Sequence, residues 1–339
     1  MNRTRLLTII RNAGRKFNLS STGYVINNMN KARKMVQHLG MEAIGEGNGV
    51  NSPLILIKAD NLGVTTVTSL LKTINFCEKV NVFVSAAGIR FIVEEGRYVQ
   101  AGVLFKSELF RTFNCNEELV GFKIPFKELL DCLKILGGDS KSSNITNDTV
   151  DGVGAPVGVG SSRSMQITYS GYGSPFALSL EENGMITEIE LRTEEEEVIT
   201  DYDGIDRKWD ITMDSRLLHE YLFELEGYSP ENVTIRVVPD SCLQFRATGA
   251  AGSLKISIPK TCGGIERFCS VANQESARYK FSILRHSFKM IHAAEKVVLQ
   301  MGDNEVLSIR LIFKETMGTT CEFHVVPLVE NMDENELDD

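Results

Sequence analysis

The feature that most constrains this chain is a predicted helix followed by three predicted strands, over residues 62–105. Apolar residues recur at helical spacing from Val64 to Ile74, where they form one stripe. From Val80 onward apolar and polar residues alternate, which is the two-residue period of a half-buried strand. The unit therefore predicts a helix packed on an antiparallel meander.

The same unit returns in the second half of the chain. Asp214 is placed to cap a helix that contains Leu217, Leu218 and Leu222. The segments VNVFVSAAGIRF and VTIRVVPDSCLQF then show the same order of strand, turn and strand. This repetition predicts an α+β fold made of two tandem pseudo-repeats, each with two helices packed on antiparallel sheets.

Further helices and strands complete each repeat. Asn61 is expected to cap the first helix, and Asn75 to end it. A second helix is expected at 125–136, with Pro125 in its first position, and its counterpart in the second repeat at 284–296. The other predicted strands cover residues 54–59, 109–123, 165–169, 176–180, 187–191, 209–213, 233–237, 243–245, 254–258, 279–283, 307–313 and 320–326.

Composition divides the chain into two predicted domains, residues 53–193 and 207–329. The first contains a predicted flexible insertion at 137–163, which is rich in Ser, Gly, Asn and Asp. An acidic linker, residues 194–206, separates the two domains. The acidic tail at 330–339 is predicted to be disordered.

Residues 1–52 form a basic extension, rich in Asn and Ser, that has no acidic residue before Glu42. Its composition is compatible with a mitochondrial presequence or with a basic tail that contacts DNA. Two plainer explanations are a disordered extension and a start codon placed too far upstream. Met29, Met35 and Met41 are internal candidates for the start.

Hydrophobic residues make up 42% and charged residues 24% of the 339 residues, which is ordinary for a globular protein and argues against a disordered, collagenous or membrane class. No apolar run approaches the roughly 20 residues of a membrane-spanning helix. The seven cysteines are scattered and never spaced C-x-x-C, so neither a disulfide framework nor a zinc site is encoded, and a reducing compartment fits. Because the formal net charge is -9, any binding of DNA requires a local basic surface.

No catalytic or cofactor-binding motif is present. The five histidines are dispersed, and H-E-x-x-H and G-x-S-x-G are absent. The stretch GVGAPVGVG lacks the Lys-Ser/Thr of a P-loop and the spacing of a dinucleotide fingerprint, so it is predicted to be a surface loop. Acidic residues concentrate in the linker and the tail, whereas a two-metal nuclease needs them on fixed elements. We therefore predict no catalysis, no metal and no cofactor.

Several segments indicate a family more specifically than the order of helices and strands does. They are SLLKTINF, YVQAGVLF, ELLDCLKILGG, YSGYGSPFALSLEENGMIT and RYKFSIL. They resemble the corresponding segments of the Rad-one subunits of the heterotrimeric nine-one-one checkpoint clamp, within the sliding clamps of the proliferating cell nuclear antigen type. The resemblance extends over residues 53–329. The N-terminal extension has no counterpart in the family, which leaves the start and the localisation open, and the insertion is unusually long.

The resemblance implies a ring of three related subunits around duplex DNA, with the helices lining the hole and the sheets outside. In that arrangement, basic residues outside the apolar stripes of the helices face the phosphates. For any one of them, an ordinary solubilising residue is the plainer explanation. The residues that the resemblance places in the channel are Lys72, Lys127, Lys134, Arg216, Arg285, Lys289 and Lys296.

Ring assembly requires strand edges that pair with neighbouring subunits. The resemblance assigns this role to the strands at 175–180 and 253–258, although either strand could lie in the middle of a sheet. The linker would cross the outer face beside a hydrophobic pocket for partner peptides, or it is simply solvated. The apolar residues concerned are Phe176, Leu178, Leu180, Leu254, Ile256 and Ile258 on the strands, and Val198, Ile199 and Ile205 in the linker.

The resemblance thus implies a non-catalytic, nuclear subunit of a heterotrimeric clamp that encircles DNA at damage sites and supports checkpoint signalling and repair. Its expected partners are two other clamp-like subunits, of the Rad-nine and Hus-one types, and an ATP-dependent checkpoint clamp loader. The other expected partners are double-stranded or primer-template DNA, and repair and signalling proteins that bind the outer face. Some family members have been described as 3′ to 5′ exonucleases, so an exonuclease is one alternative. A subunit of a homotrimeric replication clamp is the other.

Overall fold

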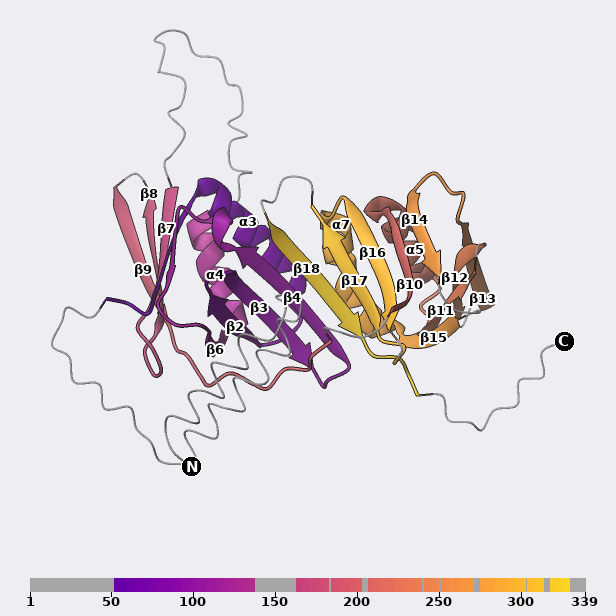
Figure 1. The fold of residues 1–339 in the computed structure, drawn as a ribbon, viewed down its shortest axis with the longest axis horizontal. Coiled ribbons are helices and arrows are strands. Elements are labelled where there is room, and N and C mark those ends of the chain that lie inside the picture. Colours follow the sequence, from indigo (N-terminus) through magenta and orange to yellow (C-terminus); the bar gives the residue numbers. More distant parts are fainter. Residues whose placement is uncertain are drawn as a thin grey trace, which may run out of the picture.

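The computed structural model of the protein describes residues 52–137, 163–182, 184–202, 207–239, 241–249, 252–270, 275–302, 304–313 and 318–329. Nearly all of the predicted N-terminal extension, the acidic tail, and most of the predicted insertion lie outside these residues. The described chain forms three antiparallel sheets with helices packed against them (Figure 1). None of the helices in this described part is long and apolar enough to cross a membrane.

The predicted helix and meander are present in the first half of the chain. Asp60 caps the first helix, α3 (Asn61–Leu71), by accepting a hydrogen bond from the Gly63 amide at 3.1 Å, one residue before the predicted cap. Asp serves as well as Asn in this position, because its side-chain oxygen satisfies an amide that has no partner within the helix. Val64 and Val67 follow on the buried face.

The remaining elements of this half follow the predicted order. Pro125 ends a strand and precedes the second helix, rather than occupying its first position. The helices are α3, η1 (Lys72–Ile74), η2 (Ser107–Leu109) and α4 (Phe126–Gly137). The strands are β1 (Ile55–Asp60), β2 (Lys79–Ser85), β3 (Gly88–Glu95), β4 (Val99–Lys106), β5 (Thr112–Cys115), β6 (Val120–Pro125), β7 (Arg163–Tyr169), β8 (Phe176–Glu182) and β9 (Met185–Leu191).

The second half repeats this order. The Asp214 carboxylate accepts a hydrogen bond from the Arg216 amide at 2.8 Å and caps α5, as predicted. The helices are α5 (Ser215–Gly227), α6 (Phe281–Leu284), η3 (Arg285–Ser287) and α7 (Phe288–Ala293). The strands are β10 (Arg207–Asp214), β11 (Asn232–Val238), β12 (Cys242–Gly249), β13 (Gly252–Pro259), β14 (Ile265–Ser270), β15 (Glu275–Lys280), β16 (Lys296–Gly302), β17 (Leu307–Ile312) and β18 (Thr319–Val325).

The last helix of the second half lies earlier than predicted, and the prediction missed β14 and β16. The helical segments α6, η3 and α7 end at Ala293, rather than continuing to residue 296. Ala294 has an extended backbone, with φ -90° and ψ 161°, so the helix stops there and Lys296 begins β16. Five of the seven residues of β16 are buried, and such a strand lacks the alternation that would distinguish it from a helix. β14 is partly exposed at every position, so no alternation marks it either.

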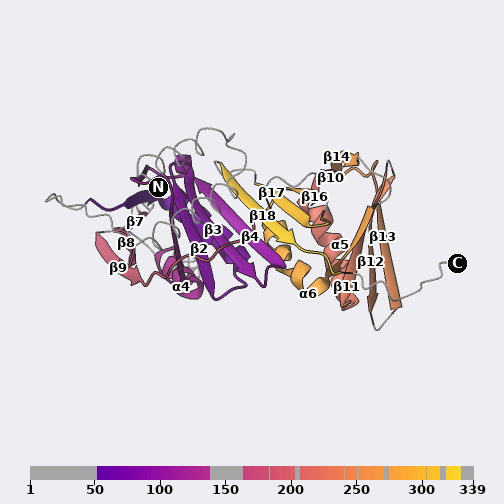
Figure 2. The same ribbon diagram turned by 60° about the horizontal axis from the view of Figure 1, so that its bottom comes forward.

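The two halves of the chain are joined in one sheet. Its nine strands have the order β14-β10-β16-β17-β18-β4-β3-β2-β6, so five come from the second half and four from the first. At the junction β18 and β4 pair antiparallel over seven residue pairs, with Phe323 opposite Ala101. Two smaller sheets, β5-β1-β7-β8-β9 and β13-β12-β11-β15, lie at the two ends of the molecule (Figures 1 and 2).

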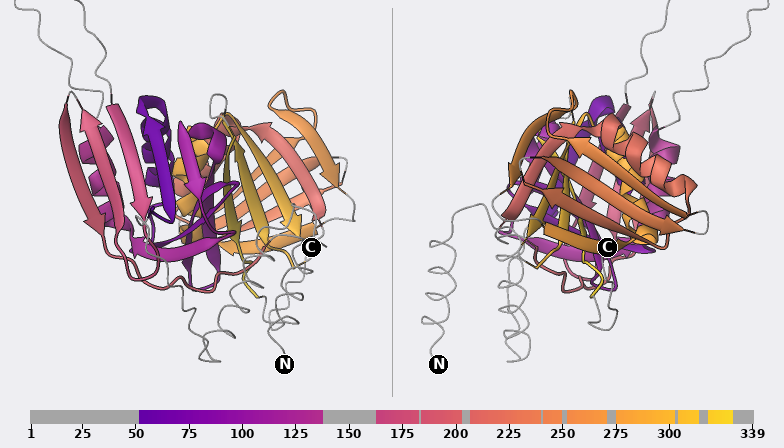
Figure 3. Two further views of the ribbon diagram at one scale, coloured as in Figure 1. Left: turned by 60° about the vertical axis from the view of Figure 1, so that its left-hand side comes forward. Right: turned by 90° about the vertical axis from the view of Figure 1, so that its right-hand side faces the viewer.

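The helices pack against both the nine-stranded sheet and the smaller sheets. α3 contacts β1, β7 and β4, while α4 contacts β2, β6 and β9. In the second half, α5 contacts β10 and β16, and α6 contacts β11 and β15. Because α7 also contacts both α5 and η1, the helices of the two halves form one continuous layer. We call this the helix layer; the strands hide much of it in the left-hand view of Figure 3.

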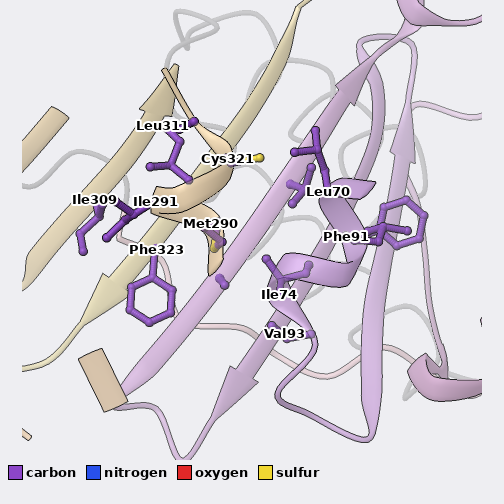
Figure 4. Close-up of a cluster of buried hydrophobic side chains, with 14 of the residues drawn as sticks. Leu70, Ile74, Phe91, Val93, Met290, Ile291, Ile309, Leu311, Cys321 and Phe323 are labelled. Atoms are coloured by element: carbon purple, nitrogen blue, oxygen red, sulfur yellow. The ribbon is translucent and has the colours of Figure 1, made fainter. Parts of the chain in front are cut away.

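One buried hydrophobic cluster runs through both halves. At the junction it takes Leu70 and Ile74 from the first half and Met290 and Phe323 from the second (Figure 4). Phe323 is fully buried, and its ring meets that of Phe76 edge-on at a centroid distance of 6.3 Å. The halves therefore share a core where their strands pair.

Replacing Phe323 by Ala should destabilise both halves together, because the side chain fills their shared core. The expected loss is about 3 to 5 kcal/mol, seen as a single unfolding transition with a lower midpoint in chemical denaturation. Phe223→Ala is the matched control, since Phe223 is 64% exposed on α5, and its effect should stay within about 0.5 kcal/mol. Two transitions, of which only one shifts, would contradict the shared core.

Candidate nucleic-acid interface and subunit edges

The predicted channel cations, with one exception, lie on the helix layer. Lys72 begins η1 and is half-buried. The others are exposed, outside the buried faces with which the helices pack against the sheets. These exposed residues are Lys127 and Lys134 on α4, Arg216 on α5, Arg285 on η3 and Lys289 on α7.

Lys296 is the exception, and its assignment to a channel helix was wrong. It begins strand β16, because the backbone becomes extended at Ala294. Its Nζ lies 2.7 Å from Glu266 Oε1 on β14. The hydrogen bond to Glu266 raises the pKa of Lys296, so the lysine stays charged and paired within the sheet.

Carboxylates on the helix layer offset many of its cations. Lys134 contacts Asp131 at 2.8 Å, and Arg285 contacts Glu226 at 2.7 Å. The net positive charge of this layer is therefore small, because paired charges of this kind largely cancel. Further exposed carboxylates on the same helices are Glu128, Glu220 and Glu224.

The helix layer also carries a group of rings that the sequence analysis missed. The ring of His219 on α5 lies 4.9 Å from that of His292 on α7 and 6.4 Å from that of Phe223. His219 and His292 are far apart in the sequence, and the fold brings their rings together. The four-residue spacing of His219 and Phe223 is a sequence signal for a shared helix face. The approach of His292 carries no such signal, because it depends on the packing of α5 against α7.

Only one of the two predicted edge strands lies at an edge. β13 is the last strand of its sheet, as the resemblance implied. β8 lies between β7 and β9, so the assignment of residues 175–180 to an edge was wrong. The alternation of β8 shows which of its faces is buried, and it carries no information on whether a further strand follows. The predicted contact residues of this strand are core residues with at most 4% exposure: Phe176, Leu178 and Leu180.

The edge of the five-stranded sheet is β9. Its first residues, Met185 and Ile186, are 72% and 64% exposed. On β13 the predicted contact residues point inward instead, since Ile256 and Ile258 are buried in the core. The edge of β13 therefore offers a partner its backbone and its polar side chains rather than these apolar ones. The third predicted residue of this strand, Leu254, is partly buried.

The remaining edges in the described part of the chain are short or covered. Glu194 forms a β-bridge with Lys123 on β6, with N···O distances of 2.9 and 2.8 Å. The Leu328 amide donates to the Arg278 carbonyl on β15 at 2.7 Å. β5 has four residues and β14 has six. No described strand or bridge runs along β9 or β13, with seven and eight residues, and Figure 1 places them at opposite ends of the molecule.

The described part of the linker crosses the outer face of the nine-stranded sheet and is bonded to it. The Glu197 amide donates to Asn81 Oδ1 on β2 at 2.9 Å. The amide and the hydroxyl of Thr200 both donate to the Glu94 carboxylate on β3 at 2.8 Å. Gln100 on β4 donates to the Thr200 carbonyl at 2.8 Å. The linker therefore runs over three successive strands of the sheet.

The predicted apolar positions of the linker differ in exposure. Val198 is 55% exposed and remains open to a partner. Ile199 is only 6% exposed and belongs to a small buried cluster with Phe83 and Ile92. A docked peptide could not reach Ile199 in this conformation. Ile205 lies outside the described residues.

On the outer face of the nine-stranded sheet, a group of charged residues connects strands on both sides of the junction between β18 and β4. Glu322 on β18 pairs with Arg310 on β17 at 2.9 Å and with Arg90 on β3 at 3.7 Å. Burial alone would raise the pKa of Glu322, but the charges of Arg310, His324 and Arg90 outweigh it and hold the pKa below its ordinary value of 4.5. Tyr202 of the linker stacks on His324 at 4.9 Å, so the linker reaches this group.

Within the described ranges, no group of three or more His, Cys, Asp or Glu side chains lies close enough together to hold a metal ion.

The sequence matches the family model described as Repair protein Rad1/Rec1/Rad17 over residues 56–313. The chain belongs to this family. The membership expected from the quoted segments is thereby confirmed.

Individual relatives agree with membership of the Rad1/Rec1/Rad17 family. The human cell cycle checkpoint protein RAD1 is 30% identical over 271 residues, which cover 78% of this chain and 89% of the relative. The DNA damage checkpoint control protein rad1 of Schizosaccharomyces pombe is 28% identical over 285 residues, which cover 80% and 87% of the two chains. A more distant relative, the DNA repair exonuclease REC1 of Mycosarcoma maydis, is 22% identical over 44% of this chain and 39% of its own length.

Among solved structures, Proliferating Cellular Nuclear Antigen from Entamoeba histolytica has a similar fold. The TM-score is 0.62 at 14% sequence identity, and the match covers 82% of this chain and 100% of the other. The predicted clamp fold of this Rad1-family chain is therefore confirmed.

Glu322→Gln should destabilise the protein near neutral pH, because it leaves Arg310 and Arg90 without a carboxylate. Since the folded pKa of Glu322 is lowered, its contribution is present above 4.5 and is lost as pH falls through the folded pKa. Denaturation should show a deficit of about 2 kcal/mol at neutral pH that shrinks in acid. Glu188→Gln, on the exposed edge strand β9, should change stability by less than about 0.5 kcal/mol. A deficit that does not change with pH would contradict this account.

Proposed function

We propose that this protein is a non-catalytic subunit of a heterotrimeric sliding clamp that encircles DNA at damage sites and supports checkpoint signalling and repair. One observation carries the proposal: the described body has a long, uncovered edge strand at each end. An edge strand exposes unpaired N–H and C=O groups, which natural proteins cover or pair. Head-to-tail pairing through two such ends builds a ring when the rotation between subunits closes.

The numbers of strands support head-to-tail pairing. The nine-stranded sheet combines five strands of one half with four of the other. The smaller sheets have five strands, ending in β9, and four strands, ending in β13. Pairing of a β9-type edge with the β13-type edge of a neighbour again joins five strands to four. The junction between subunits then repeats the junction within the chain.

The names of the relatives give the proposal its biological setting. The human and fission yeast relatives are named as checkpoint proteins. We extend that role to this chain, with a nuclear location. Its partners in the proposal are two other clamp-like subunits, DNA, and an ATP-dependent checkpoint clamp loader.

We assign the two sides of the subunit different tasks. The helix layer faces the DNA, with exposed Lys127 and Lys289 as its contacts to the phosphates. The outer face of the nine-stranded sheet takes partner peptides beside the linker, where Val198 is exposed. Docking there leaves the helix layer free, so signalling partners and DNA do not compete for one surface.

An exonuclease is the second candidate function, since one distant relative is named as such. A metal-dependent nuclease needs carboxylates that converge on Mg²⁺. No group of three or more such ligands is formed within the residues that the structure describes. We therefore propose that the protein is not a nuclease. Degradation of labelled DNA by purified protein, abolished by one acidic substitution, would contradict this.

The mass of the protein alone and with partners distinguishes the two kinds of clamp. We expect the purified chain to be monomeric, and co-expression with two other clamp-like chains to yield a complex with one copy of each. Size-exclusion chromatography with light scattering measures both states. A stable trimer of this chain alone would favour the homotrimeric replication clamp and contradict the heterotrimer.

Charge reversal on the helix layer should weaken the hold of the assembled clamp on DNA. With Lys127→Glu and Lys289→Glu combined, the slope of log affinity against log salt should become shallower by about 2, because two phosphate contacts are lost. Fluorescence anisotropy with a labelled duplex measures the slope. Lys58→Glu is the control, since Lys58 is exposed on strand β1 and not on a helix, and it should leave the slope unchanged. An unchanged slope in the double variant would contradict the channel assignment.

A further inference from the structure

A second basic surface lies on the outer face of the four-stranded sheet β13-β12-β11-β15. Alternate side chains of a strand point to opposite faces. In β11 and β12, buried residues such as Ile235 and Phe245 point to the core, so their neighbours in sequence point outward. The cations on the outward face are Arg236, Arg246, Lys255, Arg278 and Lys280.

No described outward position of these strands carries a carboxylate. The one acidic residue within them, Glu275, lies opposite the buried Val237 and pairs with Lys208 at 3.2 Å, so it belongs to the inner side. Besides the cations, most outward positions carry hydroxyl or amide groups that can donate hydrogen bonds. These residues are Asn232, Thr234, Gln244, Thr248, Ser253, Ser257 and Ser276.

Strand register places several of the cations in one row across the sheet. Arg246 lies directly opposite Lys255, and Thr234 lies opposite both Arg246 and Arg278. Neighbouring strands are about 4.8 Å apart, so the row spans about 14 Å. Like charges directly opposite each other destabilise a sheet. An anionic partner lying along the row would remove this repulsion.

The adjoining row contains polar atoms that lack partners. It consists of Ser276, Arg236, Gln244 and Ser257 in order across the strands. Within the described residues, Arg236 Nε and Gln244 Oε1 are buried and have no hydrogen-bond partner. A phosphate oxygen would accept from Arg236 Nε, whereas Gln244 Oε1 is itself an acceptor and the Gln244 amide nitrogen already donates to Cys242 Sγ at 3.2 Å.

We propose that this outer face binds the phosphate backbone of a nucleic acid, at a site separate from the helix layer. Arg and Lys interspersed with Ser, Thr, Asn and Gln are the side chains that contact phosphates and sugars. Several cations in rows match a polyanion rather than a single small anion. No aromatic residue lies among the described outward positions, so bases are not stacked and binding is independent of sequence.

The site is compatible with ring assembly but does not depend on it. A neighbour that pairs with the β13 edge extends the sheet in its own plane and leaves the outer face open. The site can therefore be tested on the isolated full-length chain. The proposal also explains how a chain with a net charge of -9 could hold a second nucleic-acid strand outside the channel, since local rather than total charge sets the attraction.

The test is binding of the isolated chain to a labelled single strand of about 30 nucleotides, and to the matching duplex, over a range of salt concentrations. Arg246→Glu combined with Lys255→Glu should lower the affinity at least about tenfold at low salt and make the salt slope shallower by about 2. The matched control is Lys58→Glu with Lys106→Glu, two exposed lysines on β1 and β4 that lie outside both basic surfaces, and it should stay within about twofold of the unsubstituted chain. Arg246→Gln with Lys255→Gln, expected to have an intermediate effect, removes charge with little change of shape. Thermal melts of each variant verify folding.

Binding that survives reversal of Arg246 and Lys255, or that the control variant lowers to the same extent, would overturn the proposal. The same variants are tested with poly-L-glutamate. If this polymer binds more tightly than DNA of equal charge, the face is a site for acidic protein segments, and the nucleic-acid assignment is wrong. None of these outcomes bears on the mass of the assembled clamp, so failure here and failure of the clamp proposal remain distinguishable.

Discussion

The pairing of β18 with β4 is the interaction on which the rest of the structure depends. It joins the two repeats in one nine-stranded sheet, and it brings Phe323 of one half against Phe76 of the other. The same junction places α7 against η1, so that the helices become one layer. Because each repeat is used in the same orientation, the two smaller sheets end at opposite ends of the molecule with β9 and β13.

Those two edges connect the fold to the proposed assembly. Within the chain, a backbone pairing supported by a shared core satisfies the edges of β4 and β18. At β9 and β13 the backbone groups of the edge remain to be paired by neighbouring subunits. The distribution of charge differs between two surfaces. Cations and carboxylates are nearly balanced on the helix layer, whereas the only charged residues at the outward positions of the four-stranded sheet are cations. The net charge of -9 describes neither surface.

Much of the fold could be predicted because side-chain periodicity records which face of an element is buried. The stripe of α3, the Asp214 cap and the repeated meander all follow from that rule. Periodicity does not show which strands lie beside a given strand in its sheet, and it disappears where a strand is buried on both faces. The edge was therefore assigned to β8 instead of β9, the mostly buried β16 was missed, and the last predicted helix was continued to Lys296, which placed that residue wrongly. Contacts between distant segments, such as His219 with His292 and the linker with Glu94, needed the structure.

The central claim is that this chain is an open segment completed by neighbours at β9 and β13. Hydrogen exchange of backbone amides, compared between the isolated chain and the assembled clamp, tests it most directly. The account predicts slower exchange in the clamp at Met185–Leu191 and Gly252–Pro259, with little change at the covered edges β6 and β15. Unchanged exchange at both strands, in a complex of confirmed stoichiometry, would contradict it.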